Sequence, residues 1–200
     1  MRVSRIQAAE NRQTVIDVAS RLFRENGFDG IGLKDLMEAA GLTQGAFYKQ
    51  FASKDDLAVQ ASRRALESAF GRWSAAAEAN PKDPLGAVIA FYLSMAHREE
   101  RGDGCPVVAL GSDAARQGVD VKASFEAGIR KYLEMLGSWI GEPDGEDSSG
   151  RAMAILSTMV GALVLSRAVN NKLLSKRFLQ AAAKDVLARS SASDAATRTD

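Results

Sequence analysis

The chain has 200 residues, with 26 Lys or Arg against 25 Asp or Glu and a formal net charge of +1 at pH 7. Hydrophobic residues make up 46% and charged residues 26%, which is typical of a soluble globular protein that buries a core. This balance excludes a globally basic nucleic-acid-binding protein, so any such function must rest on a local patch.

Few residues are available for catalysis or metal binding. The single histidine, His97, excludes a His-rich metal site within one chain and would have to serve any Ser-His-Asp triad. We find no nucleophile-elbow, Walker-type or dinucleotide-binding glycine pattern. The sequence therefore predicts no catalytic residue, metal or cofactor, although a small helical enzyme that uses His97 as a base remains an alternative.

The chemistry of the chain is typical of a cytoplasmic protein. With one cysteine, Cys105, an intrachain disulfide is impossible, which fits a reducing compartment. No signal peptide is predicted at the start of the sequence. The most apolar run, residues 152–166, contains Ser, Thr and Gly and is too short to span a bilayer, so we expect no membrane partner.

Helical periodicity runs through the whole chain, and strand-like alternation is nearly absent. Glycine and proline set the breaks between helices. The sequence predicts about nine helices, at residues 11–26, 33–40, 43–51, 53–79, 84–100, 105–117, 119–140, 151–170 and 175–189. We expect an all-α fold with a three-helix head at 1–55, a helical body at 56–190 and a disordered tail at 191–200.

The first three predicted helices match a helix-turn-helix pattern, in which a tight link at Gly41 joins the second helix to the third. At about 100° per residue, Phe47 and Phe51 share one face of the third helix and pack inward. The opposite arc carries Gln44, Gly45, Ala46, Tyr48 and Lys49. Gln can pair with adenine, Lys with guanine or phosphate, and a Tyr hydroxyl with phosphate, whereas small residues let the backbone approach the bases. The alternative is a small helix with core aromatics and solvated charges.

The run from Val15 to Leu57 resembles the DNA-binding head of the TetR family of bacterial transcriptional regulators. The resemblance covers about a quarter of the chain. The matching positions are Ala19, Leu22 and Phe23 in the first helix, Gly27-Phe28 in the turn after it, Gly41 through Phe51, and then Ser53, Lys54 and Leu57. It implies a head that binds operator DNA and a diverged helical body that dimerises and holds a ligand.

Carried over by position, the resemblance implies phosphate contacts from Thr43, Tyr48 and Lys54. It implies base contacts from Gln44, Gly45, Ala46 and Lys49, and a base or phosphate contact from Lys34. Arg2 and Arg5 form a basic arm with no acid before Glu10, which we also expect to bind DNA. Two positions depart from the family pattern: Gln50 stands where the family usually has His, and Gly32 replaces the usual Ser or Thr N-cap.

In the body, the resemblance implies that the last two helices pair with their copies in a homodimer, as a two-fold operator requires. The residues expected in this interface are Leu156, Met159, Val160, Leu163 and Phe178. A purely intramolecular core is the alternative for the same residues.

The ligand pocket is predicted from helices that line it in the family. Its expected residues are Phe91, Tyr92, Met95, Cys105, Phe125, Tyr132 and Trp139. Each aromatic could equally be plain core, and Cys105 a small buried hydrophobe. At a helix N-terminus, however, the Cys105 thiolate would be stabilised, and the residue could then sense electrophiles or oxidants.

These patterns together predict a homodimeric transcriptional regulator, a repressor that binds a palindromic double-stranded operator and is released by a small, mostly apolar effector. A repressor that senses oxidants through Cys105 is one alternative. A small helical enzyme and a helical protein–protein adaptor are the others, and an adaptor would have no use for the Tyr48 and Lys49 arc.

Overall fold

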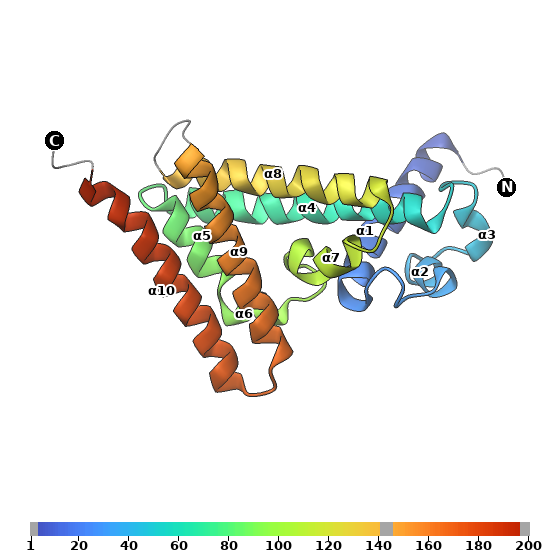
Figure 1. Ribbon diagram of the computed structural model, residues 1–200. Coiled ribbons are helices and arrows are strands. Elements are labelled where there is room, and N and C mark those ends of the chain that lie inside the picture. The colour runs from blue at the N-terminus through green and yellow to red at the C-terminus, as the bar shows by residue number, and fades with distance from the viewer. Residues whose placement is uncertain (1–3, 141–145, 197–200) are drawn as a thin grey trace. The chain divides into compact units, whose positions relative to one another are not determined.

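A computed structural model describes residues 4–140 and 146–196 of the chain (Figure 1). Every helix or strand assigned in these ranges is an α-helix, which confirms the predicted all-α fold. The elements are α1 (Arg5–Asn26), α2 (Leu33–Ala39), α3 (Gln44–Phe47), α4 (Lys54–Ala79), α5 (Pro84–Tyr92), α6 (Met95–Glu99), α7 (Pro106–Ala114), α8 (Val119–Ile140), α9 (Glu146–Ala168) and α10 (Lys172–Ala196).

The described residues contain ten helices because the helix predicted at 84–100 is two helices. Ser94 has an extended backbone, with φ −87° and ψ 155°, and its hydroxyl accepts a hydrogen bond from the His97 amide. A serine in this conformation is an N-cap, so a new helix, α6, begins after Ser94 instead of α5 continuing through it. The sequence pattern missed this break because the apolar periodicity continues on both sides of Ser94, and a single serine inside such a pattern does not by itself indicate a helix end.

Two predicted boundaries near the end of the chain also differ. Residues 141–145 of the predicted polar loop 141–150 lie outside the described residues, and α9 already begins at Glu146. Helix α10 continues to Ala196, into the segment 191–200 that was predicted to be disordered. Residues 197–200 of that segment lie outside the described residues.

The chain divides into two compact units. Unit 1 comprises residues 1–69 and 101–128, and unit 2 comprises residues 70–100 and 129–200. The division falls inside α4, after residue 69, and inside α8, after residue 128, whereas the sequence suggested a head that ends at residue 55. The turn 101–104, helix α7 and the first part of α8 therefore belong with the three-helix head, which the sequence pattern did not indicate.

Unit 1 has one hydrophobic core. Phe23 of α1, Leu36 of α2 and Phe47 of α3 are at most 1% exposed in it. Leu110 of α7 and Phe125 of α8 complete the same cluster. Burial of this apolar surface is the main force that holds the short helices α2 and α3 in place.

A buried arginine joins the end of α1 to the turn 101–104. The side chain of Arg24 is 2% exposed, and its Nε and Nη2 atoms donate to the carbonyl and hydroxyl of Ser20 at 2.9 and 3.1 Å. Its Nη1 atom donates to the carbonyl of Gly104 at 3.0 Å. Loss of the guanidinium would leave a buried carbonyl without a partner, so this contact couples the turn to α1.

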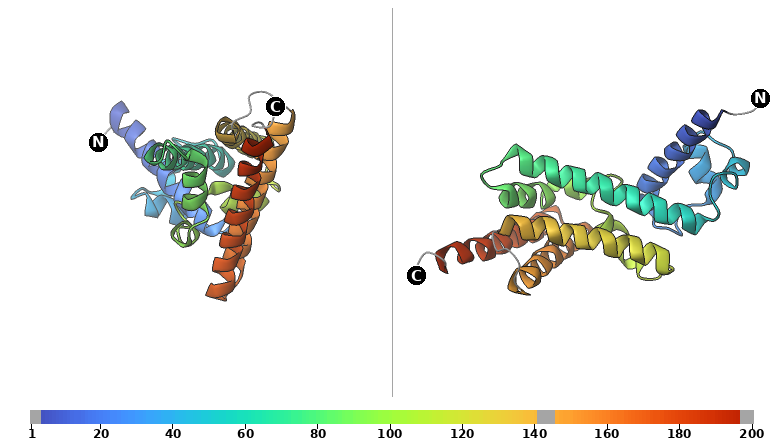
Figure 2. Two further views of the ribbon diagram at one scale, coloured as in Figure 1. Left: turned by 90° about the vertical axis from the view of Figure 1, so that its left-hand side faces the viewer. Right: turned by 90° about the horizontal axis from the view of Figure 1, so that it is seen from above.

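In unit 2, α9 and α10 lie side by side and antiparallel (Figure 2). Arginines connect the ends of α6 and α9 in both directions. Arg98 of α6 donates to the carbonyl of Ser166, and Arg167 of α9 donates to the carbonyls of His97 and Arg98 at 2.9 Å. These bonds satisfy carbonyls that a helix end would otherwise leave unpaired.

Helix α9 contains the most apolar stretch among the described residues. Residues 149–168 are long and apolar enough, by length and composition, to cross a membrane, with a mean hydropathy of 1.4 and 39% of the window buried. The expectation that this segment is too short rested on residues 152–166 alone. The apolar segment is longer than expected, so its length does not exclude a membrane span. Buried core helices of soluble proteins reach the same length and hydropathy.

His97 is buried in unit 2, at 3% exposure. Its Nδ1 atom lies 2.7 Å from the carbonyl of Tyr92, and its ring stacks on Phe91. Burial lowers the pKa of His97 below its usual 6.5, and Arg167 and Arg72 lower it further, whereas the Tyr92 carbonyl and Glu100 act in the opposite direction.

The lowered pKa predicts a loss of stability in mild acid. The unfolded chain takes up a proton on His97 below about pH 6.5, whereas the folded chain resists it until a lower pH. The stabilisation is therefore complete above pH 6.5 and is lost as the pH falls towards the folded-state pKa. In urea unfolding at pH 7.5 and pH 5.5, the free energy of unfolding should fall less for His97→Gln than for the wild-type protein. An equal fall in both proteins would contradict this assignment.

Candidate nucleic-acid interface

A glycine in the left-handed region makes the turn between α2 and α3. Gly41 has φ +71°, its amide donates to the Glu38 carbonyl, and the Leu42 amide donates to the Met37 carbonyl, each at 2.9 Å. Glycine adopts this conformation without the strain that a Cβ atom would cause. The turn sends Leu42 back against the core of unit 1 and starts α3 at a fixed angle.

The recognition segment, residues 43–51, is shorter as a helix than predicted. Helix α3 ends at Phe47, and a turn follows in which the amides of Gln50 and Phe51 donate to the Phe47 carbonyl at 2.8 and 3.0 Å. Phe47 is fully buried and Phe51 is 3% exposed, with their rings stacked at 5.3 Å. The structure thus places both phenylalanines inward, as the helical projection predicts.

The other side of the recognition segment faces solvent. Thr43, Gln44, Gly45, Tyr48 and Lys49 are exposed, and Ala46 is half-buried against the core. Tyr48 is 69% exposed, although its ring meets that of Phe47 edge-on at 5.3 Å. Within the described residues, Lys49 has no ion-pair partner and the Thr43 hydroxyl makes no capping bond. The four exposed side chains and the open surface at Gly45 are thus available to an external ligand.

No steric contact within the chain requires a glycine at position 45. A Cβ atom built on Gly45 would meet no atom within 4 Å, and its φ lies outside the left-handed region. Glycine in a helix is less favourable than alanine by up to about 1 kcal/mol. Gly45 thus leaves open space at the exposed surface of α3, which would allow the close approach of another molecule.

The structure gives the predicted lysines different surroundings. Lys34 is exposed and lies 3.8 Å from Glu38 in an i,i+4 pair. The ammonium of Lys54 donates to the Ile31 carbonyl at 2.8 Å and lies 6.0 Å from the centre of the Phe23 ring. Lys54 thus holds the loop before α2, a structural role that the sequence pattern did not indicate.

The two arginines of the predicted basic arm are only partly covered by the structure. Arg5 is the first residue of α1 and is exposed, while Arg2 lies outside the described residues. The N-cap of α1 is Ser4, whose hydroxyl accepts from the Gln7 amide at 3.1 Å. Arg5 is therefore presented on a helix rather than on an extended strand.

A further cation, Arg12 of α1, contacts the end of the recognition segment. Its Nε atom donates to the Gln50 carbonyl at 3.4 Å, and its guanidinium carbon lies 4.9 Å from the centre of the Phe51 ring. The Gln50 amide oxygen is buried and has no hydrogen-bond partner among the described residues. Sequence reasoning missed Arg12, because a single arginine on α1 carries no signal of which carbonyl it will meet.

The predicted ligand-pocket residues fall into two groups. Cys105 and Phe125, which are 3% and 4% exposed, belong to unit 1, and Phe125 is part of its core. The other five belong to unit 2: Phe91, Tyr92, Met95, Tyr132 and Trp139. The structure therefore does not bring all seven residues into one site within a single unit.

The aromatic residues of unit 2 gather around Trp73, which is 2% exposed. Its ring lies 4.6 Å from that of Tyr132, 5.6 Å from that of Tyr92 and 6.3 Å from that of Trp139. Tyr92 and Tyr132 are almost completely buried. These aromatics pack against one another as a core cluster. Trp73, which the sequence did not single out, is its centre.

The predicted dimer residues are largely buried in the chain itself. Leu156, Met159 and Leu163 are at most 7% exposed, and only Val160 and Phe178 of the predicted set remain half-buried. The first three thus serve the intramolecular core. A different apolar face is exposed near the junction of α9 and α10, where Val164, Leu165, Leu173 and Leu174 are 42%, 49%, 69% and 42% exposed.

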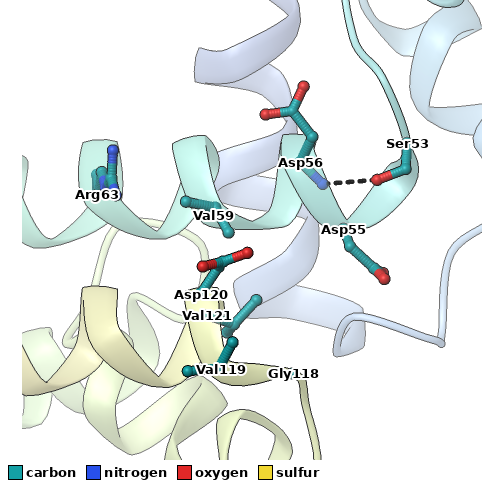
Figure 3. A pocket seen from close by; sticks show the side chains of 9 residues that line it. All are labelled: Ser53, Asp55, Asp56, Val59, Arg63, Gly118, Val119, Asp120 and Val121. Atoms are coloured by element: carbon teal, nitrogen blue, oxygen red, sulfur yellow. Dashed lines mark hydrogen bonds between the residues drawn. The ribbon is translucent and has the colours of Figure 1, made fainter.

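A pocket of about 450 Å³ opens between the first turns of α4 and α8 in unit 1 (Figure 3). Its lining residues are Ser53, Asp55, Asp56, Val59, Arg63, Gly118, Val119, Asp120 and Val121. Asp56 accepts from the Ala52 amide while its own amide donates to Ser53, which is a capping arrangement. Asp55 and Asp120 lie in the first turns of their helices, where carboxylates stabilise the helix dipole. The acids are thus explained by helix capping, and we assign no ligand to this pocket.

The sequence of the helix-turn-helix region, which includes the recognition segment, matches a known family. Residues 15–61 match the family model described as bacterial regulatory proteins, tetR family. The chain is 35% identical over 104 residues to the HTH-type transcriptional regulator AcrR of Shigella flexneri, which covers 50% of this chain and 48% of the relative. It is 22% identical to the HTH-type transcriptional repressor NemR of Escherichia coli K12, over 64% of this chain and 65% of the relative. The matched parts thus span about half to two thirds of these relatives.

Solved structures extend the match over the fold. A TetR transcriptional regulator from Chloroflexus aurantiacus superimposes with a TM-score of 0.75 at 26% identity, over 90% of this chain and 93% of that one. The reduced form of E. coli NemR has the same fold, with a TM-score of 0.73 at 20% identity over 88% and 95% of the two chains. The helix-turn-helix geometry, the family model and these relatives agree. Residues 15–61 of the chain thus match the tetR family of bacterial regulatory proteins, and the chain as a whole has the fold of solved TetR-family regulators.

Proposed function

We propose that the protein is a homodimeric repressor that binds a palindromic operator and is released by a small, mostly apolar effector. The observation that carries this proposal is the exposed side of the recognition segment. It offers an amide, a phenol and an unpaired ammonium around a glycine that the chain does not need for its own packing. The names of relatives, a transcriptional regulator and a transcriptional repressor, support the same function.

In this proposal the exposed residues divide between bases and backbone. Gln44 and Lys49 carry the groups that read adenine and guanine in the major groove. Tyr48 and Thr43 offer hydroxyls to phosphate, and Arg5 adds a cation on α1. Gly45 and Ala46 allow the helix backbone to come close to the base edges. Lys34 is exposed for a phosphate contact, whereas Lys54 already donates to Ile31.

The dimer would form through the exposed apolar face of Val164, Leu165, Leu173 and Leu174. These side chains leave apolar surface in water near the junction of α9 and α10, which a second copy would cover. A two-fold dimer would present two recognition segments to half-sites about one DNA turn apart. Val160 and Phe178 are half-buried and can contribute to the same interface.

We place the effector among the aromatic side chains of unit 2, where the surroundings suit a small, mostly apolar molecule. Phe91, Met95 and Trp139 are half-buried there, so each keeps some surface that a ligand could cover. Such a ligand would act by population shift, favouring the arrangement of helices that binds DNA poorly.

The signal would reach the head through the turn 101–104, which follows α6 directly in the chain. Arg24 bonds the Gly104 carbonyl at 3.0 Å, and the Phe28 amide donates to Asp113 of α7 at 3.4 Å. A shift of this turn or of α7 would therefore pull on the end of α1. Because α1 shares its core with α2 and α3, the recognition segment would move with it.

A second candidate function is a thiol-sensing repressor that acts through Cys105. Cys105 is the N-cap of α7 and directly follows Gly104, the residue that Arg24 holds. The structure of NemR, a relative of the same fold, is described as a reduced form, which points to a redox state in that protein. Oxidation of Cys105 would enlarge a buried side chain beside the Arg24 contact.

A small helical enzyme that uses His97 receives less support. The ring of His97 is buried against Phe91 and Tyr92, so a substrate would have to displace packed aromatics to reach it. A base must lie within hydrogen-bond reach of the proton that it removes. We therefore assign His97 to the packing of unit 2.

The substitution Gly45→Ala separates DNA binding from folding. Alanine meets no neighbour within 4 Å and favours helix, so thermal stability should stay the same or rise slightly. Operator affinity should fall about tenfold or more, because the added methyl group keeps the helix from the base edges. Gel shifts with the DNA that flanks the gene, together with thermal unfolding, measure both effects. Unchanged affinity would contradict the proposed DNA face.

The substitution Leu165→Glu tests the dimer face. A buried charge at a two-fold interface is costly, so sedimentation should show a monomer with little operator affinity. Val119→Glu is a matched control, because Val119 is 77% exposed in unit 1 and lies outside the proposed interface. A Leu165→Glu protein that remains dimeric would rule out this face.

The substitution Cys105→Ser decides between the two modes of release. Under the effector mechanism, operator complexes of the wild-type and Cys105→Ser proteins should respond equally to treatment with quinones or peroxide. Under the thiol mechanism, treatment should release DNA from the wild-type protein only. Gel shifts before and after treatment, with dithiothreitol added to test reversal, measure the difference.

A further inference from the structure

We infer that Arg12 is a positioning residue, which holds the end of the recognition segment at the angle needed to read DNA bases. The inference rests on the proposed DNA-binding function. Neither the family model nor the sequence motif assigns a role to Arg12. Its contacts with Gln50 and Phe51 carry the argument.

The recognition segment needs support from outside itself. Helix α3 has only four residues, whereas isolated helices shorter than about 12 residues are marginal in water. Phe47 and Phe51 anchor one side of the segment in the core. Apolar burial is non-directional, so it fixes the depth of the segment better than its rotation. A directional contact is needed to fix the rotation.

Arg12 supplies such a contact at the end of the segment. Its Nε atom donates to the Gln50 carbonyl at 3.4 Å, and its guanidinium lies over the Phe51 ring at 4.9 Å. The planar guanidinium thus meets one main-chain acceptor and one ring at once, which a lysine cannot do in the same geometry. Tyr48 and Lys49 directly precede Gln50, so their direction depends on this end of the segment.

Among the described residues, no other side chain from outside the recognition segment makes a hydrogen bond to it. Lys54 acts nearby, but on the Ile31 carbonyl before α2.

The consequence for DNA binding is specific. Base contacts need hydrogen-bond geometry, whereas phosphate contacts from flexible cations tolerate small displacements. Loss of the Arg12 contact should therefore weaken binding to the operator much more than binding to unrelated DNA. A phosphate contact from Arg12 would instead weaken both and would reduce the salt dependence.

The test is the substitution Arg12→Gln in the full chain, with Arg5→Gln as the same change elsewhere on α1. Fluorescence anisotropy would measure the Kd for a duplex that carries the palindrome footprinted beside the gene and for an unrelated duplex, at several salt concentrations. For Arg12→Gln we expect operator affinity to fall about tenfold or more, with unrelated binding within twofold of wild type and the salt slope unchanged. Arg5→Gln should leave the ratio of the two affinities unchanged.

Two results would overturn the inference. One is an equal loss for both duplexes with a salt slope smaller by about 0.9, which marks a phosphate contact. The other is no change for either duplex. If Arg12→Gln lowers the unfolding temperature too far, Arg12→Lys keeps the charge without the planar fork and should show the same loss of preference. A wild-type protein that does not prefer the palindrome would refute the proposed function itself, which is a distinct outcome.

Discussion

A helix of four residues has no stability of its own, so the recognition face depends on the burial of Phe47. Its fully buried ring stacks on Phe51 and belongs to a core shared by α1, α2, α4, α7 and α8. Because this core fixes the inner side of the segment, Tyr48 and Lys49 on its outer side are held in solvent. The core of unit 1 is therefore the condition for any contact with DNA.

The cations of unit 1 follow a second constraint, because several of them hold backbone carbonyls. Arg24 bonds Gly104, Lys54 bonds Ile31 and Arg12 bonds Gln50. Each contact ties a loop or a helix end to a longer helix. Positive charge near the recognition segment is thus partly structural, and among the described residues Lys34, Lys49 and Arg5 are the exposed cations that the proposed function assigns to DNA.

Local patterns predicted much of the fold and of the site. The helical periodicity, the turn at Gly41 and the inward placement of Phe47 and Phe51 all depend on nearby residues, and each agrees with the structure. Long-range pairing was not predictable, since no local signal shows that α7 joins the head or that Arg24 meets Gly104. Burial of Leu156, Met159 and Leu163 also depends on which side of α9 faces the chain's own core. An apolar stripe is compatible with either a core or an interface.

The central claim is that residues 43–49 read a DNA sequence. The most direct measurement is selection of wild-type protein on randomised duplex DNA, followed by sequencing and by binding at several salt concentrations. We predict enrichment of one palindrome with half-sites about one helical turn apart, bound with an affinity that falls steeply with salt. Recovery of no common sequence, or of binding that is equal for all duplexes, would contradict the claim.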